Sequence, residues 1–349
     1  MNIKEFGQNF FGPLLSQYLK SVFEGSNEGH LYYCLAREGH FIQAAISELK
    51  KQGLLDTTID SRYLIVSRVF MFKILLGAPE SWQFSLSPKF EGNLQTLLAH
   101  RFNLSQTIID SILSEAEQTT DINLPEDIDT VKAVFLKHHN ELSSVVSGAK
   151  IAYLAYLEYK GFGVDDIEHN VLDIGYSGTI QKLLTLLTST STTGHYFIAS
   201  KPGTHVVAGN NVQMHGVFKE GVKLGDGHVM LDRSLFLESL LTAPSAQLVD
   251  LRINPLAPDN EEKFEFFYGM RANCQKQFYL LQELMSGAIE HVVHCFKYDI
   301  EYSNDDLDNL YEQYVSKPNM IPHGVRHLFE IDDAISGNAT ISYQQLFQL

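Results

Sequence analysis

The sequence has few basic residues and few cysteines, and each shortage excludes a class of protein. It holds 26 Lys and Arg against 42 Asp and Glu, which gives a formal net charge of −16. Proteins that bind duplex nucleic acid neutralise phosphates with many basic side chains, so we expect no nucleic-acid partner. The three cysteines are an odd number, and Cys34 lies in an apolar, strand-like run, which argues against a disulfide framework.

Long hydrophobic runs are also missing. No segment approaches the roughly 18 uninterrupted apolar residues of a transmembrane helix, and the first ten residues lack the apolar core of a signal peptide. What the chain does have is 349 residues, 44% of them hydrophobic, which is enough to bury a large core. We therefore expect a folded protein with no transmembrane segment, located in the cytoplasm or peripherally at the inner face of the membrane.

Short segments rich in β-branched and aromatic residues predict five strands. They cover residues 31–36, 63–67, 170–174, 195–199 and 212–218. Helical periodicity follows the first and the third strand, and this alternation is typical of an α/β fold. Several of the strands are apolar on both faces, as the central strands of a parallel sheet are. The predicted fold class is α/β, with a largely parallel central sheet flanked by helices.

Two stretches depart from this alternation. Between about 92 and 160 no strand pattern appears and apolar residues recur at helical spacing, which predicts a helical insertion, with 119–126 as a loop between two of its helices. From about residue 261 the pattern is helical again, and the apolar stripe over 278–296 indicates core packing. The proline-containing connector 253–260 is the predicted boundary between an α/β domain, 1–252, and a helical part, 253–349, packed on the same core.

Residues 171–184, VLDIGYSGTIQKLL, predict a buried strand, a turn of small residues and an amphipathic helix in immediate succession. Gly175 and Gly178 permit backbone conformations closed to other residues, and the free N–H groups of a helix's first turn favour a phosphate. Asp173 stands at the strand's carboxyl end, where open α/β sheets place their ligands. The segment indicates an anion site; the alternative is a capped strand-to-helix turn with Ser177 or Thr179 as N-cap.

Two other predicted strands also end in charged residues. The first runs into Arg37-Glu38-Gly39, and the second ends in Ser67-Arg68. If these strands and the one before Asp173 are neighbours in a parallel sheet, Arg37, Arg68 and Asp173 converge on one edge. Such a pocket offers bidentate arginine donors and a carboxylate for a hydroxyl or a metal ion, so a small polyanion is its natural ligand.

Three other patterns carry less weight. His291, His294 and Cys295 place metal-ligand residue types on one helix, but no second cluster with ligand spacing accompanies them, so helix core or surface is the preferred interpretation. Ser177 lies in a sequence similar to a nucleophile elbow, but Thr179 stands where that motif has glycine. No Gly-Lys-Ser/Thr follows the loop, so it is not a Walker A motif.

Five motifs, taken in their order, resemble the glycan phosphoribosyltransferase module of bacterial ribofuranosyltransferases, which is often fused to a haloacid dehalogenase-type phosphatase. The motifs are GPLL at 12–15, LAREG at 35–39, YLIVSR at 63–68, DIGYSGTIQ at 173–181 and LLTAPS at 240–245. The similarity spans about residues 10–250, and DIGYSGTIQ is its most specific element. It implies that residues 1–252 form a phosphosugar-binding catalytic domain.

The resemblance implies a pentosyltransferase that moves 5-phosphoribose from phosphoribosyl pyrophosphate to a sugar hydroxyl of a bacterial surface polysaccharide, an O-antigen or a capsule. The expected acceptor is a glycan, free or lipid-linked. Mg²⁺ would bridge the pyrophosphate, with Asp173 as its candidate protein ligand. No Asp-x-Asp phosphatase motif is evident near the start of the chain, so a separate haloacid dehalogenase-type phosphatase is the expected partner.

The resemblance also implies roles for single residues. Asp173 would bind the ribose hydroxyls, and Arg37 and Arg68 would stabilise the departing pyrophosphate. Glu38 is the candidate general base, with Glu238 in reserve. The further substrate-binding residues are Gly39, Ser67, Gly175, Tyr176, Ser177, Gly178, Thr179 and Gln181, and the backbone of 176–179 would hold the 5-phosphate.

The chain departs from the family pattern at two positions. Glu38 stands where the family usually has aspartate, which moves the carboxylate further from the backbone, and Val69 replaces a common second arginine. The exchange at position 38 keeps a second hypothesis open, a non-catalytic phosphosugar-binding or scaffold subunit of a polysaccharide assembly complex. A third hypothesis is hydrolysis of a phosphorylated or acyl substrate with Ser177 as the nucleophile.

Overall fold

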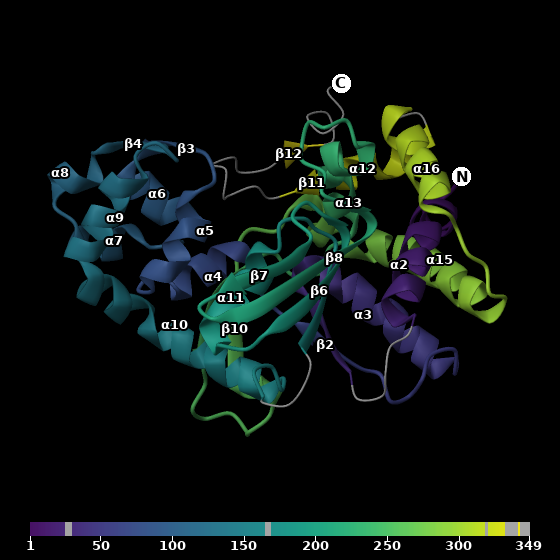
Figure 1. Cartoon of the computed structure of the whole chain (residues 1–349), viewed down its shortest axis with the longest axis horizontal. Helices are drawn as coiled ribbons and strands as arrows, with labels where there is room; N and C mark the ends of the chain where they lie inside the picture. Colours follow the sequence, from purple (N-terminus) through teal and green to yellow (C-terminus); the bar gives the residue numbers. More distant parts are fainter. Residues whose placement is uncertain (25–29, 165–168, 318–319, 332–340, 343–349) are drawn as a thin grey trace.

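A six-stranded sheet forms the centre of the molecule (Figure 1). The computed structural model describes residues 1–24, 30–164, 169–317, 320–331 and 341–342. The strands are β1 (Leu31–Leu35), β2 (Asp60–Leu64), β5 (His169–Asp173), β6 (Thr192–Ala199), β7 (Gly203–Val207) and β8 (Asn210–Glu220). Their order is β2-β1-β5-β6-β8-β7, and all neighbours are parallel except β7 and β8. The predicted fold class is confirmed.

All five predicted strands are present, but the second is displaced toward the N-terminus. β2 ends at Leu64 because the next N–H, that of Ile65, donates to the hydroxyl of Tyr156 at 3.0 Å. Ser67, predicted to end this strand, instead caps the following helix by accepting the N–H of Phe70. β7 was not predicted, because this edge strand is mostly exposed and lacks a regular apolar pattern.

Helices cover both faces of the sheet (Figure 1). One face carries α2 (Gly12–Phe23), α3 (Ala36–Lys51) and α15 (Phe278–Lys297); the other carries α4 (Arg68–Ile74), α10 (His139–Tyr159) and α11 (Thr179–Thr188). Successive side chains of a strand point to opposite faces, so β1 supplies Tyr32 and Cys34 to the first core and Leu31, Tyr33 and Leu35 to the second. The continuous apolar run of β1 follows from this double burial.

The predicted helical insertion forms a lobe beside the sheet (Figure 1). Its elements are α5 (Trp82–Leu86), β3 (Phe90–Asn93), α6 (Leu94–Arg101), α7 (Gln106–Ile112), α8 (Glu115–Gln118), β4 (Asp121–Leu124) and α9 (Ile128–Lys137), followed by α10. The expectation of a strand-free loop at 119–126 is wrong, because β4 pairs antiparallel with β3. Its alternation of exposed and buried side chains covers only four residues, which is too short to be distinctive in a sequence.

The connector 253–260 is a hairpin loop in the structure. It leads from β9 (Leu248–Ile253) through a short 3-10 helix (Glu261–Lys263) to β10 (Phe264–Tyr268), which pairs antiparallel with β9. The α-helices therefore resume only from α14 (Asn273–Lys276), later than the expected start at about 261. The hairpin is fixed to earlier residues, since Lys73 on α4 forms an ion pair with Asp250 at 2.9 Å. Beyond it, α15 and α16 (Asn304–Ser316) pack into the same core as α2 and α13 (Ser234–Leu240).

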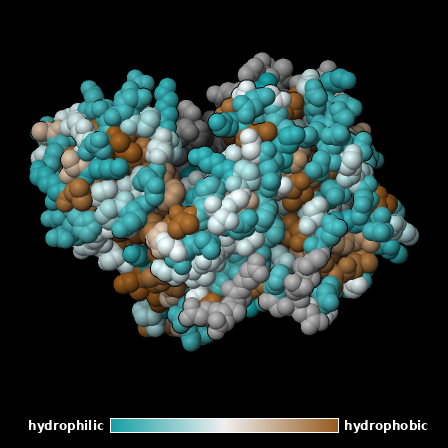
Figure 2. Space-filling model, in the orientation of Figure 1, coloured by the Kyte–Doolittle hydropathy of each residue, from teal (hydrophilic) through white to brown (hydrophobic). Residues whose placement is uncertain are grey.

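The surface is largely hydrophilic on the face shown in Figure 2, in keeping with the acidic composition. Hydrophobic side chains gather along its lower left edge, where α10 runs, and the exposed ones of that helix include Ile151 at 63% and Tyr159 at 44%. Over the described ranges, no helix is both long enough and apolar enough to cross a bilayer.

Gly39 sets how closely α3 follows β1. A Cβ atom on Gly39 would lie 2.3 Å from the carbonyl carbon of Cys34 and 2.5 Å from its oxygen. Those are backbone atoms of β1, which cannot move without disturbing the sheet. The glycine therefore allows the helix to start directly at the strand's end.

We expect Gly39→Ala to lower the free energy of unfolding by about 2 kcal/mol, because the added methyl group overpacks the junction of β1 and α3. The matched control is Gly148→Ala on α10, where the new Cβ has no heavy atom of the described chain within 4 Å. There the better helix propensity of alanine should raise stability by about 0.5–1 kcal/mol. Urea denaturation measures both, and equal effects of the two substitutions would contradict this account.

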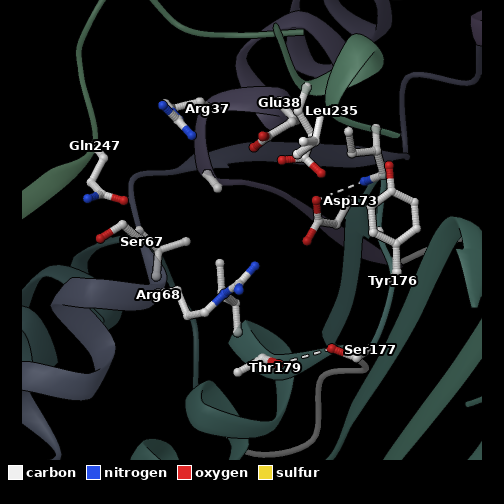
Figure 3. Close-up of a pocket in the computed structure, with 16 residues that line it drawn as sticks. Arg37, Glu38, Ser67, Arg68, Asp173, Tyr176, Ser177, Thr179, Leu235 and Gln247 are labelled. Atoms are coloured by element: carbon white, nitrogen blue, oxygen red, sulfur yellow. Dashed lines mark hydrogen bonds between the residues drawn. The ribbon is translucent and has the colours of Figure 1, made fainter. Parts of the chain in front are cut away.

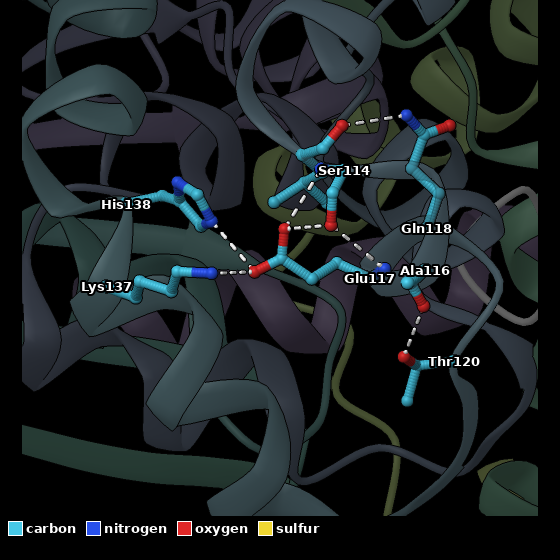
Figure 4. Close-up of polar contacts among 8 residues, drawn as sticks. Ser114, Ala116, Glu117, Gln118, Thr120, Lys137 and His138 are labelled. Atoms are coloured by element: carbon cyan, nitrogen blue, oxygen red, sulfur yellow. Dashed lines mark hydrogen bonds and ion pairs between the residues drawn. The ribbon is translucent and has the colours of Figure 1, made fainter.

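A polar network centred on Glu117 connects α8 with the junction of α9 and α10 (Figure 4). Ser114 caps α8, and its N–H and hydroxyl both donate to Glu117 Oε2, at 2.9 and 2.7 Å. The other oxygen, Oε1, accepts from Lys137 Nζ at 2.7 Å and lies 3.0 Å from His138 Nε2. The hydrogen bonds from Lys137 and His138 lower the pKa of Glu117, which ties α8 to the junction of α9 and α10.

We expect Glu117→Gln to cost about 1 kcal/mol of stability at pH 7, because the ion pair with Lys137 and part of the cap are lost. The folded-state pKa of Glu117 is lowered, so the stabilisation is complete above its unfolded pKa and declines as the pH falls below about 4. Urea titrations at pH 7 and pH 3 should therefore show a smaller difference between variant and wild type at pH 3. Glu115→Gln, on the same helix and exposed, is the control.

Candidate functional site

The residues that follow β1, β2 and β5 line one cavity of about 380 Å³ (Figure 3). From β1 the sheet extends through β2 in one direction and through β5 in the other, so the cavity lies at the switch point of the strand order, where parallel sheets bind their ligands. The lining residues are Ala36, Arg37, Glu38, Val66, Ser67, Arg68, Asp173, Ile174, Gly175, Tyr176, Ser177, Thr179, Ile180, Leu235, Glu238 and Gln247. The volume is within the range of small-molecule sites.

Two guanidinium groups line this cavity, those of Arg37 and Arg68. Arg37 is in the first turn of α3 and Arg68 is the first residue of α4, which places both at the carboxyl edge of the sheet. Across the parts of the chain that the structure describes, neither forms a hydrogen bond or an ion pair (Figure 3). The turn before Arg37 is tight, since Ala36 has a φ of 57°. Forked donors left open in a cavity are suited to phosphate or carboxylate oxygens.

The loop between β5 and α11 presents an uncapped helix start to the cavity. The N-cap is Gly178, in the left-handed conformation with a φ of 64°, and no side chain among the described residues caps the helix, so the alternative of a turn capped by Ser177 or Thr179 is wrong. The hydroxyls of those two residues bond each other at 3.1 Å instead. The first-turn N–H groups of α11 are therefore left for a ligand.

Neighbouring groups fix the path of this loop. The carbonyl of Tyr176 accepts both the N–H and the hydroxyl of Ser200, each at 2.8 Å, and Lys182 Nζ donates to the carbonyl of Ser177 at 2.7 Å. Gly178 has a positive φ and Gly175 does not. No heavy atom of the described residues lies within 4 Å of a Cβ placed on Gly175, so the missing side chain leaves space in the cavity. The loop is thus shaped before any ligand binds.

Three carboxylates occupy the cavity wall: Asp173 and Glu38, which are 9% and 8% exposed, and the half-buried Glu238. Asp173 Oδ1 accepts the N–H of Ile174 at 2.8 Å. Burial, and then the nearby charges of Glu38 and Glu238, raise the pKa of Asp173 well above its usual value. Burial also raises the pKa of Glu38, against the opposing charge of Arg37. Carboxylates that are buried away from solvent need other polar partners, so they favour a ligand with hydroxyl groups or a bound cation.

The structure brings most of the predicted site residues together but leaves three outside the cavity. Gln181 is fully buried, and its Nε2 donates to the carbonyls of Thr192 and Gln213 at 3.2 and 3.0 Å. Its role is therefore to fix α11 on the sheet, and its assignment to substrate binding is corrected. Gly39 packs against β1, and Gly178 provides the turn behind the loop.

Leu235 and Gln247 line the cavity but were not predicted. Leu235 precedes Glu238 by three residues, so helical spacing from that candidate could have indicated it. Gln247 comes from the segment before β9, and no local pattern predicts that this segment reaches the end of β2. Its position follows from long-range contacts such as the hydrogen bond from the Ser67 hydroxyl to the carbonyl of Leu248, 2.5 Å.

The remaining sequence patterns have structural roles. His291 Nε2 lies 2.8 Å from the hydroxyl of Tyr302, and Cys295 is fully buried. In the described part of the chain no group of three or more His, Cys, Asp and Glu side chains could hold a metal ion by itself. No histidine is among the described residues that line the cavity, so Ser177 has no imidazole base there.

No family model matches the chain, and no curated protein matches it. What the protein does is therefore inferred from the cavity and its motifs.

Proposed function

We propose that the protein is a glycan phosphoribosyltransferase, which transfers 5-phosphoribose from phosphoribosyl pyrophosphate to a sugar hydroxyl during synthesis of a bacterial surface polysaccharide. The observation that carries the proposal is one cavity in which two open guanidinium groups and an uncapped helix start accompany a buried carboxylate at a strand end. The donor has the matching chemistry, because its phosphates are anionic and its ribose carries hydroxyls.

In this proposal the donor spans the cavity. The backbone N–H groups of 176–179 and the start of α11 hold the 5-phosphate. Asp173 accepts hydrogen bonds from the ribose hydroxyls, and Arg37 and Arg68 bind the pyrophosphate oxygens in their forks. The Asp173 carboxylate, shielded from water in the free protein, gains partners when the donor binds.

The reaction breaks the bond between the anomeric carbon and the pyrophosphate oxygen and forms one to the acceptor oxygen. Positive charge develops on the ribose and negative charge on the leaving group, so Arg37 and Arg68 stabilise the transition state from fixed positions. Glu38 or Glu238 accepts the proton of the attacking hydroxyl. Both carboxylates line the same cavity as the arginines.

Mg²⁺ fits this site as a companion of the donor. The described residues offer no ready set of three metal ligands, which suits an ion that takes most of its ligands from pyrophosphate and water. Asp173 is the protein residue we assign to it. When bound, Mg²⁺ supplies positive charge to the leaving group.

The product of this reaction retains its 5-phosphate, so a phosphatase must follow. We propose a separate haloacid dehalogenase-type enzyme as that partner, and a free or lipid-linked glycan at the cytoplasmic side of the membrane as the acceptor.

The direct test incubates the purified protein with phosphoribosyl pyrophosphate, Mg²⁺ and a panel of glycan acceptors, and follows pyrophosphate release. We expect release that depends on one acceptor class and a product that carries a phosphoribosyl group by mass spectrometry. Calorimetric binding of the donor without turnover on any acceptor would favour a scaffold subunit, the hypothesis kept open by Glu38. Neither binding nor turnover would contradict the proposal.

A further inference from the structure

The two ends of the cavity differ in chemistry (Figure 3). Arg68 and the loop at Thr179 lie at one end. At the other end Leu235 of α13 lies beside Glu38, with the ring of Tyr176 to one side. Glu238, from the same helix as Leu235, also lines the cavity, and its charge acts on Tyr176. One end of the cavity therefore carries Arg68 and the anion-binding loop, and the other combines apolar surface with carboxylates.

The position of Leu235 and Glu238 follows from the packing of α13. Phe236, Leu237 and Leu240 are 2%, 0% and 1% exposed and belong to the core shared with α2 and α15. Residues three apart lie on the same side of a helix, so Leu235 and Glu238 share the opposite side, where both are only partly buried. Phe236, Leu237 and Leu240 therefore pack in the core, while Leu235 and Glu238 line the cavity.

The preceding residue is tied to the core, which fixes α13 in place. The hydroxyl of Tyr311 on α16 donates to the carbonyl of Arg233 at 2.8 Å. The ring of Phe236 packs against that of Phe329, with centroids 5.1 Å apart. α13 is thus a fixed wall of the cavity, in contrast to a loop that would adapt to any ligand.

The charges of the cavity determine which substrate can bind against α13. The donor's phosphates are drawn to Arg37 and Arg68 and repelled by Glu238, so the donor leaves the α13 end open. A neutral sugar ring suits that end, because its C–H face packs on Leu235 and Tyr176 while its hydroxyls donate to a carboxylate.

We infer that α13 forms the acceptor subsite of the enzyme: Leu235 packs against the apolar face of a neutral pyranose, and Glu238 accepts hydrogen bonds from its hydroxyls. This inference rests on the proposed function and deepens it by naming the residues that select the acceptor. It assigns Glu238, which lies nearer the solvent than Glu38, to the acceptor and leaves Glu38 close to the arginines.

The test uses the full chain loaded with Mg²⁺ and phosphoribosyl pyrophosphate, and a panel of methyl pyranosides as acceptor probes. Saturation-transfer NMR measures binding of the pyranosides, and calorimetry measures the Kd of the donor. We expect Glu238→Gln to weaken pyranoside binding about tenfold, the effect of losing a hydrogen bond to a charged group. The donor Kd should stay within threefold or improve, because a like charge near its phosphates is removed.

Two further variants separate this role from a structural one. Leu235→Ala should weaken pyranoside binding several-fold and leave the donor Kd unchanged. Glu265→Gln, an exposed glutamate on β10, should change neither. Donor binding weakened by Glu238→Gln as much as by Arg68→Ala would overturn the inference, as would equal pyranoside binding by Glu238→Gln and wild type, or no pyranoside binding by the loaded wild type. A wild-type protein that does not bind the donor would instead refute the proposed function, and this inference with it.

Discussion

Arg68→Ala is expected to weaken the binding of phosphoribosyl pyrophosphate about 10- to 100-fold. A hydrogen bond between charged groups contributes about 1.5–3 kcal/mol, and each 1.4 kcal/mol is a factor of ten in affinity. Arg37→Ala should have a similar effect, and the double variant should lose roughly 1,000-fold. Arg68→Lys keeps the charge but loses the fork, so it should recover only part of the affinity.

Calorimetry with the Mg²⁺ complex of the donor measures these effects, and unfolding curves show whether each variant is folded. Because neither arginine bonds to a described residue, both alanine variants should stay folded, with a small loss of stability from removing positive charge beside the buried Glu38. Arg252→Ala is the matched control, since Arg252 on β9 is 68% exposed and does not line the cavity. Wild-type affinity in the double variant would show that the donor does not bind at this edge of the sheet.

Asp173→Asn is expected to lower the rate of phosphoribosyl transfer at least about 100-fold and yet not to destabilise the protein. The amide keeps an oxygen for the N–H of Ile174 but loses the charge that binds hydroxyls or Mg²⁺. It also removes a buried carboxyl group whose ionised form is disfavoured by burial and by Glu38.

The pH dependence of the free energy of unfolding provides a second test of the Asp173→Asn variant. The folded-state pKa of Asp173 is raised, so between the unfolded value of about 4 and that raised pKa the folded protein holds a proton that the unfolded chain releases. Stability from this group therefore falls as the pH rises through that range. Asp173→Asn should flatten the fall, and urea titrations at pH 5 and pH 8 test it. A variant that is less stable than wild type at pH 8, or fully active, would contradict the assignment.

The sheet could be predicted because its central strands are buried on both faces. β1 must supply apolar side chains to both cores, and a short apolar run such as Leu31–Leu35, bounded by polar residues, is typical of a strand in that position. β4 and the hairpin of β9 and β10 could not be predicted in the same way. They are short, they are partly exposed, and long-range contacts such as the ion pair between Lys73 and Asp250 hold the hairpin in place.

The meeting of Arg37, Arg68 and Asp173 could also be predicted, because each follows a strand and the carboxyl ends of parallel strands share one edge. The motif alone did not predict which way the side chain of Gln181 points. Gln181 belongs to the same motif as Thr179, but two residues along a helix turn the side chain away from the cavity and onto the sheet. Membership of a motif does not show which side a residue faces.

The central claim is that one cavity at the ends of β1, β2 and β5 holds a phosphorylated ribose donor by both its phosphate groups. A crystal structure of the protein with Mg²⁺ and phosphoribosyl pyrophosphate tests this most directly. We predict the pyrophosphate in contact with Arg37 and Arg68, the 5-phosphate on the backbone of 176–179, and the ribose hydroxyls at Asp173. A donor bound elsewhere on the protein, or a cavity that remains empty at saturating donor, would contradict the account.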